Sequence, residues 1–222
     1  MAQNLPRRTS DTAGLGLRLN LGCGPVQPEG WINVDGSHRA RLASTLPWVD
    51  RALVRIGLLP ATDFGRRTTY GNLFKPLPYG DDSVRAIYAG ELWEHFTYED
   101  AERLTRECFR VLAPGGVLRV CVPDGEIFWR HYLRLVERGD PATIRQHVGL
   151  FFGEICTKPT LGSYGHFHKW QFDEPQLVDM FRACGFLDAA RMAFHVSRIP
   201  DVHLVERSDF LIVEGIKEPQ PA

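Results

Sequence analysis

Apolar and polar residues follow two different periods along the chain, and these periods predict the secondary structure. Short runs rich in aliphatic and aromatic residues have the composition of buried strands. They cover residues 17–21, 31–35, 68–72, 84–89, 117–122, 189–195 and 209–216. Between several of these runs, apolar residues recur at helical spacing. Strands that alternate with helices in this way predict a parallel sheet that is covered on both faces.

Three helices are predicted from amphipathic patterns with recognisable ends. The first covers residues 98–112, with Thr97 as its N-terminal cap. The second follows Asp124, and the third starts after an N-cap at Asp173 and stops at Gly185.

The strand predicted at residues 17–21 ends in the turn Gly22-Cys23-Gly24, which is a candidate ligand site. Glycine lets the backbone approach a ligand because it has no Cβ. Eleven positions after Gly24, the next strand ends in Asp35. The Asp35 carboxylate can accept hydrogen bonds from both hydroxyls of a ribose. Together the turn and Asp35 predict a nucleoside cofactor, although such turns also serve as plain strand-to-loop connections.

The link between the first two strands is too short for the usual crossover. Only six residues separate Gly24 from Trp31, and they include Pro25 and Pro28. A parallel crossover through a helix needs about a dozen residues, so we expect the first crossover helix to be shortened or absent. Gln27 stands where a dinucleotide-binding fingerprint has its third glycine. This disfavours a nicotinamide cofactor.

A cluster of polar residues follows the strand at 84–89 and consists of Gly90, Glu91, Glu94 and His95. In open α/β sheets, ligands bind at the carboxyl ends of the strands. Two carboxylates and an imidazole at that edge therefore suit acid–base chemistry. The alternative interpretation is that Glu94 and His95 only brace the following helix.

A third candidate is the stretch Ser163–Trp170, which interleaves glycine and aromatic residues with His166 and His168. Aromatic rings provide apolar walls, and imidazoles titrate near neutral pH. This composition indicates a loop that faces a substrate, but metal ligands or surface histidines are alternatives. The other histidines, including His38, have no such setting and are expected to be structural.

Four motifs occur in the order typical of small class I S-adenosylmethionine-dependent methyltransferases of type 11, which the chain resembles over about residues 17–123. They are Leu21-Gly22-Cys23-Gly24 with Asp35, Pro76-Leu77-Pro78 with Ser83, Glu94-His95-Phe96, and Arg110 to Gly116. The resemblance implies an α/β fold with a Rossmann-like, doubly wound sheet of seven strands, mostly parallel with an antiparallel C-terminal strand. It also implies S-adenosylmethionine as the cofactor. The expected cofactor-binding residues are Gly22, Cys23, Gly24, Asp35, Gly36, Asn72, Leu73 and Gly90.

The resemblance implies methyl transfer by in-line displacement, in which the protein holds the donor and the acceptor close and aligned. A hydroxyl acceptor needs a general base, for which His95, His166 or His168 qualify, with Glu94 orienting an imidazole. We therefore expect O-methylation of a small molecule or glycan. N-methylation, a nicotinamide-dependent oxidoreductase and a non-catalytic cofactor-binding module remain alternatives.

The spacing Glu91-x-x-Glu94-His95 is similar to a metal-binding motif of ubiquinone-pathway O-methyltransferases and small-RNA ribose methyltransferases. Carboxylates and imidazoles suit magnesium, manganese or zinc. A divalent metal is therefore compatible with this site, although we do not favour it.

Charge and cysteine content limit the partners and the compartment. The 222 residues include 26 Lys and Arg and 27 Asp and Glu, for a formal net charge of −1. This balance predicts no attraction to nucleic acid or to an anionic membrane. No apolar run approaches the roughly 18 residues of a membrane span. Five cysteines without C-x-x-C spacing predict buried thiols in a reducing, cytoplasmic compartment.

We expect one methyltransferase domain over residues 15–217, between a loose N-terminal segment at 1–14 and a loose tail at 218–222. Two long stretches, residues 36–67 and 124–170, depart from a minimal sheet and read as insertions. They could roof an acceptor pocket or form the surface of a homodimer.

Overall fold

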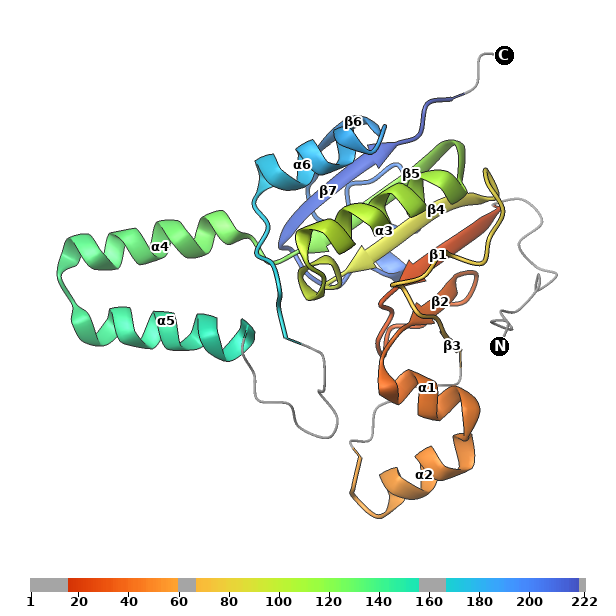
Figure 1. Ribbon diagram of the computed structural model, residues 1–222, viewed down its shortest axis with the longest axis horizontal. Helices are drawn as coiled ribbons and strands as arrows, with labels where there is room; N and C mark the ends of the chain where they lie inside the picture. Colours follow the sequence, from red (N-terminus) through yellow and green to blue (C-terminus); the bar gives the residue numbers. More distant parts are fainter. Residues whose placement is uncertain (1–15, 60–66, 156–166, 220–222) are drawn as a thin grey trace.

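A computed structural model describes residues 16–59, 67–155 and 167–219. The expected N-terminal segment 1–14, the end of the tail, His166 and Cys156 lie outside these ranges. At the centre of the fold is a twisted seven-stranded sheet (Figure 1). Its strands are β1 (Leu17–Leu21), β2 (Ile32–Asp35), β3 (Thr68–Tyr70), β4 (Val84–Gly90), β5 (Leu112–Val122), β6 (Leu187–Arg191) and β7 (Leu211–Ile216).

The strands lie in the order β3-β2-β1-β4-β5-β7-β6. β1 to β5 pair in parallel, and β7 is antiparallel to both β5 and β6. Each strand overlaps a predicted apolar run, so the predicted sheet with an antiparallel C-terminal strand is confirmed. This order places the carboxyl ends of β1, β2 and β4 next to one another, where open α/β sheets bind ligands.

The two faces of the sheet are covered differently. Leu21, Ile87 and Leu118 belong to a large buried cluster that also includes residues of helices α3 (Tyr98–Val111) and α6 (Glu174–Ala183). On the opposite face, Tyr88 packs in a smaller cluster with Ile199 and residues around the short 3-10 helix η2 (Val202–Leu204). An irregular segment between β6 and β7 therefore contributes to the cover of this face, where the sequence pattern predicted helices.

The predicted helix caps are present. The Thr97 hydroxyl accepts a hydrogen bond from the Asp100 backbone N–H, and the Asp173 carboxylate accepts one from that of Gln176. The second predicted helix is α4 (Gly125–Arg138), which begins after an N-cap at Asp124. These side chains satisfy backbone N–H groups that have no partner within the helix.

The connection from β1 to β2 contains no helix, as its length predicted. It is held by the fully buried Asn20, whose amide donates to the Val26 carbonyl at 2.9 Å and to the side chain of Asn33 at 3.0 Å. A buried amide group must find hydrogen-bond partners. Asn20 thereby fixes the path of the glycine turn without a crossover helix.

Both insertions contain helices, and of these the sequence pattern predicted only the helix that follows Asp124. In the first, α1 (His38–Thr45) and α2 (Pro47–Arg55) are joined by an ion pair of 2.5 Å between Arg39 and Asp50. In the second, α4 is followed by α5 (Pro141–Ile155), and the pair projects from the sheet as a hairpin (Figure 1).

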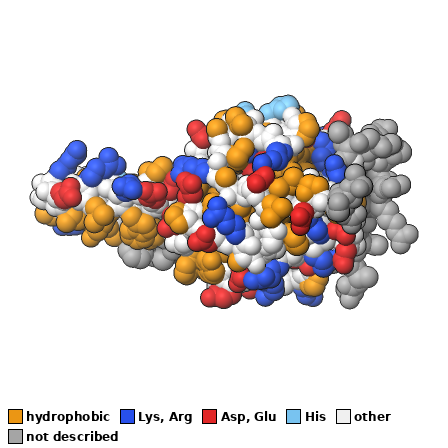
Figure 2. Space-filling model, turned by 90° about the horizontal axis from the view of Figure 1, so that it is seen from above, with side chains coloured by type: hydrophobic (Ala, Val, Ile, Leu, Met, Phe, Trp, Pro, Cys, Tyr) orange, Lys and Arg blue, Asp and Glu red, His pale blue; other side chains and the backbone are white. Residues whose placement is uncertain are grey.

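The hairpin has an apolar edge and a charged edge (Figure 2). Within it, the Phe128 ring stacks on His147 and packs against Phe151, each with ring centroids 4.2 Å apart. Large apolar side chains remain exposed along α4, including Trp129 and Leu133 at 48% and 58%. The expected homodimer surface stays a prediction for this region. None of the described helices is long and apolar enough to cross a membrane.

A buried ion network ties the second face of the sheet to its cover. Arg119 on β5 is fully buried and donates hydrogen bonds to Glu206 at 2.7 and 3.0 Å and to Glu214 at 3.2 Å. Its guanidinium also donates to the backbone carbonyls of Ala193 and Val196. Five such bonds match the five N–H donors of arginine. The network fixes Glu206, whose chain neighbour Arg207 lines the candidate site.

Candidate active site

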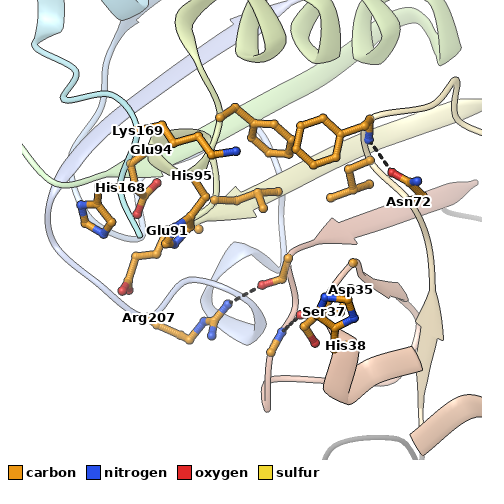
Figure 3. A pocket seen from close by; sticks show the side chains of 18 residues that line it. Asp35, Ser37, His38, Asn72, Glu91, Glu94, His95, His168, Lys169 and Arg207 are labelled. Atoms are coloured by element: carbon orange, nitrogen blue, oxygen red, sulfur yellow. Dashed lines mark hydrogen bonds between the residues drawn. The ribbon is translucent and has the colours of Figure 1, made fainter. Parts of the chain in front are cut away.

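A cavity of about 460 Å³ opens at the carboxyl ends of β1, β2 and β4 (Figure 3). It brings together most of the residues that the sequence singled out. The lining includes Gly22, Gly24, Asp35, Gly36, Asn72, Leu73, Gly90, Glu91, Glu94, His95 and His168. The remaining expected catalytic residue, His166, lies outside the described part of the chain.

Cys23 is the expected cofactor residue whose side chain points elsewhere. Its thiol is buried and lies 3.7 Å from the Thr68 hydroxyl. Burial raises the pKa of this thiol to about 12. Cys23, Cys108, Cys121 and Cys184 are all free and buried, as predicted for thiols in apolar segments.

The glycine turn has the backbone conformation that its sequence predicts. Gly22 and Gly24 have φ angles of 63° and 51°, in the left-handed region that side chains disfavour. A Cβ at Gly22 would also lie 3.1 Å from the side chain of Leu92. The turn therefore needs glycine for its shape, and it presents bare backbone to the cavity.

Asp35 connects this turn to the start of α1. One carboxylate oxygen accepts from the Gly24 backbone N–H at 3.0 Å, and the other accepts from that of Ser37 at 2.8 Å. Each oxygen keeps a second lone pair. The carboxylate is thus held in place at the cavity wall and can still accept the two hydroxyls of a ribose.

Asn72 and Leu73 lie across the cavity from the acidic cluster. The Asn72 side-chain oxygen accepts from the Phe74 backbone N–H at 3.0 Å, which turns the chain after β3. The Phe74 ring packs against Phe96 with centroids 4.9 Å apart. This wall offers an apolar surface beside a polar amide, a combination that suits a flat heteroaromatic ring.

Glu94 is the most unusual residue of the cavity. It lies in the 3-10 helix η1 (Trp93–His95), which is anchored by a hydrogen bond from the Trp93 indole to Thr105. The Glu94 side chain is 1% exposed, and neither carboxylate oxygen has a hydrogen-bond partner among the residues that the structure describes. Burial raises the pKa of this carboxyl to about 8.

Two imidazoles lie next to this carboxyl. The rings of His95 and His168 pack edge to face with centroids 5.0 Å apart. His95 Nδ1 is 3.2 Å from the Phe167 carbonyl, so a proton on this nitrogen leaves Nε2 as an acceptor. The Lys169 backbone N–H donates to the Glu94 carbonyl at 2.7 Å, which holds the two segments together.

One ligating atom from each of Glu94, His95 and His168 lies within 4.8 Å of the others. We call these three residues the Glu-His-His group. The sequence named Glu91 as a metal candidate in place of His168, but the Glu91 carboxylate accepts a hydrogen bond from Ser208. The group can act on a proton, because it combines a raised carboxyl pKa with imidazoles. Its atoms are also those that divalent cations bind.

Several lining residues were not found from the sequence. His38 was expected to be structural but lines the cavity at the start of α1. Lys169 and Arg207 line it as well. Arg207 precedes an antiparallel strand, and such a strand begins at the sheet edge where its parallel neighbours end. That topological signal could have placed it at the site.

Comparison with known proteins agrees with this geometry. Residues 19–120 match a family model described as a methyltransferase domain. No curated protein matches the chain significantly. Among solved structures, an S-adenosylmethionine-dependent methyltransferase from Methanosarcina mazei superimposes with a TM-score of 0.50 at 17% identity, over 92% of this chain and 93% of that one.

Two further solved structures are similar at lower TM-scores. An S-adenosylmethionine-dependent methyltransferase from Thermotoga maritima has a TM-score of 0.48 at 18% identity, over 91% of this chain and 82% of that one. Magnesium protoporphyrin IX methyltransferase from Synechocystis, with bound S-adenosylhomocysteine, has a TM-score of 0.47 at 12% identity, over 91% and 74%.

Proposed function

We propose that the chain is a class I S-adenosylmethionine-dependent methyltransferase, which the match of residues 19–120 to a methyltransferase domain supports. We further propose that it methylates a hydroxyl oxygen of a small molecule or glycan, with a histidine as the general base. The family match favours methyl transfer over a nicotinamide-dependent oxidoreductase and over a non-catalytic module. The observation that carries the proposal is the Glu-His-His group, which lines the same cavity as the glycine turn and Asp35.

The residues of the cavity fit this donor. The bare turn at Gly22 and Gly24, the remaining lone pairs of Asp35 and the amide of Asn72 match the groups of an adenosine. S-adenosylmethionine supplies an electrophilic methyl group when it is bound. The protein then has to orient the acceptor and remove its proton, because the transfer is an in-line displacement.

His95 or His168 accepts the proton of the acceptor hydroxyl. The resulting imidazolium lies beside Glu94, and a positive charge there favours the ionised form of this carboxyl. Glu94 is therefore a positioning and charge-stabilising residue, and a histidine is the base. Phe74, Phe96 and Lys169 also line the cavity and are available to contact the acceptor.

The acceptor is found by incubating the protein with labelled donor and a metabolite extract, followed by mass spectrometry of the labelled product. The base is then tested with His95→Gln and His168→Gln against the control His203→Gln, which changes an exposed histidine on η2. Loss of a general base should reduce kcat by roughly 10²- to 10⁴-fold, with S-adenosylhomocysteine binding unchanged. Normal kcat in both variants, or a methylated nitrogen in the product, would contradict the proposal.

A divalent cation held by the same group is the second candidate mechanism. The unpartnered oxygens of Glu94 and the 4.8 Å spacing favour it. A bound cation would lower the pKa of an acceptor hydroxyl, so that no histidine base would be needed to remove its proton. Treatment with EDTA decides between the two mechanisms. If a histidine is the base, EDTA leaves turnover unchanged and elemental analysis of the untreated protein finds no metal. If a metal acts, EDTA removes both the metal and the turnover, and added Mn²⁺ restores turnover.

A further inference from the structure

Arg207 places a positive charge directly over the glycine turn. It lies between η2 and β7, and one guanidinium nitrogen donates to the Gly22 carbonyl at 3.3 Å. Another lies 3.3 Å from the point that a Cβ at Gly24 would occupy. The side chain therefore lies against both glycines. It also lines the cavity, where Figure 3 labels it. Any ligand seated on this turn therefore meets the guanidinium.

Glu91 places a negative charge at the same end of the cavity. Its φ angle of 54° is in the left-handed region, which costs a residue with a side chain about 1 kcal/mol or more. Its backbone N–H donates to the Cys121 carbonyl at 2.8 Å, and its carboxylate accepts from the Ser208 hydroxyl at 2.5 Å. In Figure 3, Glu91 and Arg207 lie on the side opposite Asn72. Strained backbone of this kind is concentrated at functional sites.

These two charges have no ion-pair partners within the part of the chain that the structure describes. Within residues 16–59, 67–155 and 167–219, neither Glu91 nor Arg207 forms an ion pair. Both side chains are exposed and both line the cavity. An acid and a base that remain unpaired with each other at one end of a cavity are complementary to a ligand that carries both charges.

We propose that Arg207 binds the α-carboxylate and Glu91 the α-ammonium of the methionine part of the donor. With the ribose at Asp35 and the adenine ring at Asn72, the adenosine occupies the side of the cavity away from Arg207. The amino-acid part of the donor then lies at the Arg207 end. Guanidinium and carboxylate are matched in geometry. The inference rests on the cofactor and is independent of the acceptor and of the histidine base.

Binding calorimetry tests the assignment without an acceptor. The two ligands are S-adenosylhomocysteine and 5′-deoxy-5′-methylthioadenosine, which lacks the amino-acid part. Arg207→Gln and Glu91→Gln should each weaken the binding of S-adenosylhomocysteine by about 10- to 100-fold, which is the range for one charge-assisted hydrogen bond. Both variants should bind methylthioadenosine as the unmodified protein does, and this arm also shows that they are folded.

Lys169→Gln is the matched control, because it removes another cation from the lining of the same cavity. It should leave the affinity for both ligands unchanged. The proposal is overturned if Arg207→Gln lowers the affinity for both ligands equally, or if it leaves the affinity for S-adenosylhomocysteine unchanged. In the second case the guanidinium does not bind the donor carboxylate. A loss with Lys169→Gln equal to that with Arg207→Gln would also overturn it, since the effect would then be one of general charge.

Discussion

Glu94→Gln should change how the stability of the protein depends on pH. The carboxyl is buried and unpartnered within the described part of the chain, and burial raises its pKa from 4.5 to about 8. Between these values the folded protein keeps a proton that the unfolded chain releases. The contribution of this carboxyl to stability is therefore largest below pH 4.5, falls as the pH rises, and levels off above about pH 8.

The size of the effect follows from the pKa difference. Each pKa unit corresponds to about 1.36 kcal/mol, so the full loss of stability from this group is about 5 kcal/mol. About 4 kcal/mol of this falls between pH 5 and pH 9 by the same linkage. Glutamine has a similar shape and does not titrate, so Glu94→Gln should gain that amount relative to the unmodified protein over this range.

The assay is urea unfolding at pH 5, 7 and 9 in EDTA, which keeps metal ions off the Glu-His-His group. Glu99→Gln, at an exposed position on α3, is the matched control and should leave the pH dependence unchanged. If the free energies of unfolding of Glu94→Gln and the unmodified protein run parallel from pH 5 to pH 9, Glu94 is not a buried carboxyl with a raised pKa.

Three further substitutions test other parts of the account. Asp35→Ala removes both hydrogen bonds to a ribose and should weaken the binding of S-adenosylhomocysteine, measured by calorimetry, by at least about 10-fold. Unchanged affinity would contradict the role of Asp35. Gly22→Val forces a β-branched residue into the left-handed region and should abolish this binding while circular dichroism stays native; retained binding would refute the need for a bare turn. Arg119→Met leaves buried Glu206 without its ion-pair partner and leaves Glu214 with Arg198 alone, so it should destabilise the protein by about 3–5 kcal/mol in urea. A loss below 1 kcal/mol would contradict that network.

The parts that could be predicted from the sequence depend on local patterns. The strands could be predicted because each is a short apolar run, and the turn at Gly22 because two glycines interrupt such a run before Asp35. The missing crossover helix followed from the length of the link alone. The first insertion was harder. Helix α1 buries only Ala40 and Ala43, so its sequence carries little amphipathic pattern.

The parts that could not be predicted depend on contacts between distant segments. Arg207 reaches the glycine turn because β7 runs antiparallel to its neighbours. His168 lies beside Glu94 because the next two residues, Lys169 and Trp170, donate backbone hydrogen bonds to the Glu94 carbonyl. The raised pKa of Glu94 arises from burial, which its charged character did not suggest. Composition and spacing do not encode which loops meet at the edge of a sheet.

A crystal structure with S-adenosylhomocysteine tests the central claim most directly. We predict that the ribose hydroxyls bind Asp35, that the turn at Gly22 and Gly24 contacts the ligand, and that the sulfur faces the Glu-His-His group. A ligand bound outside this cavity, or one whose sulfur points away from Glu94, would contradict the account.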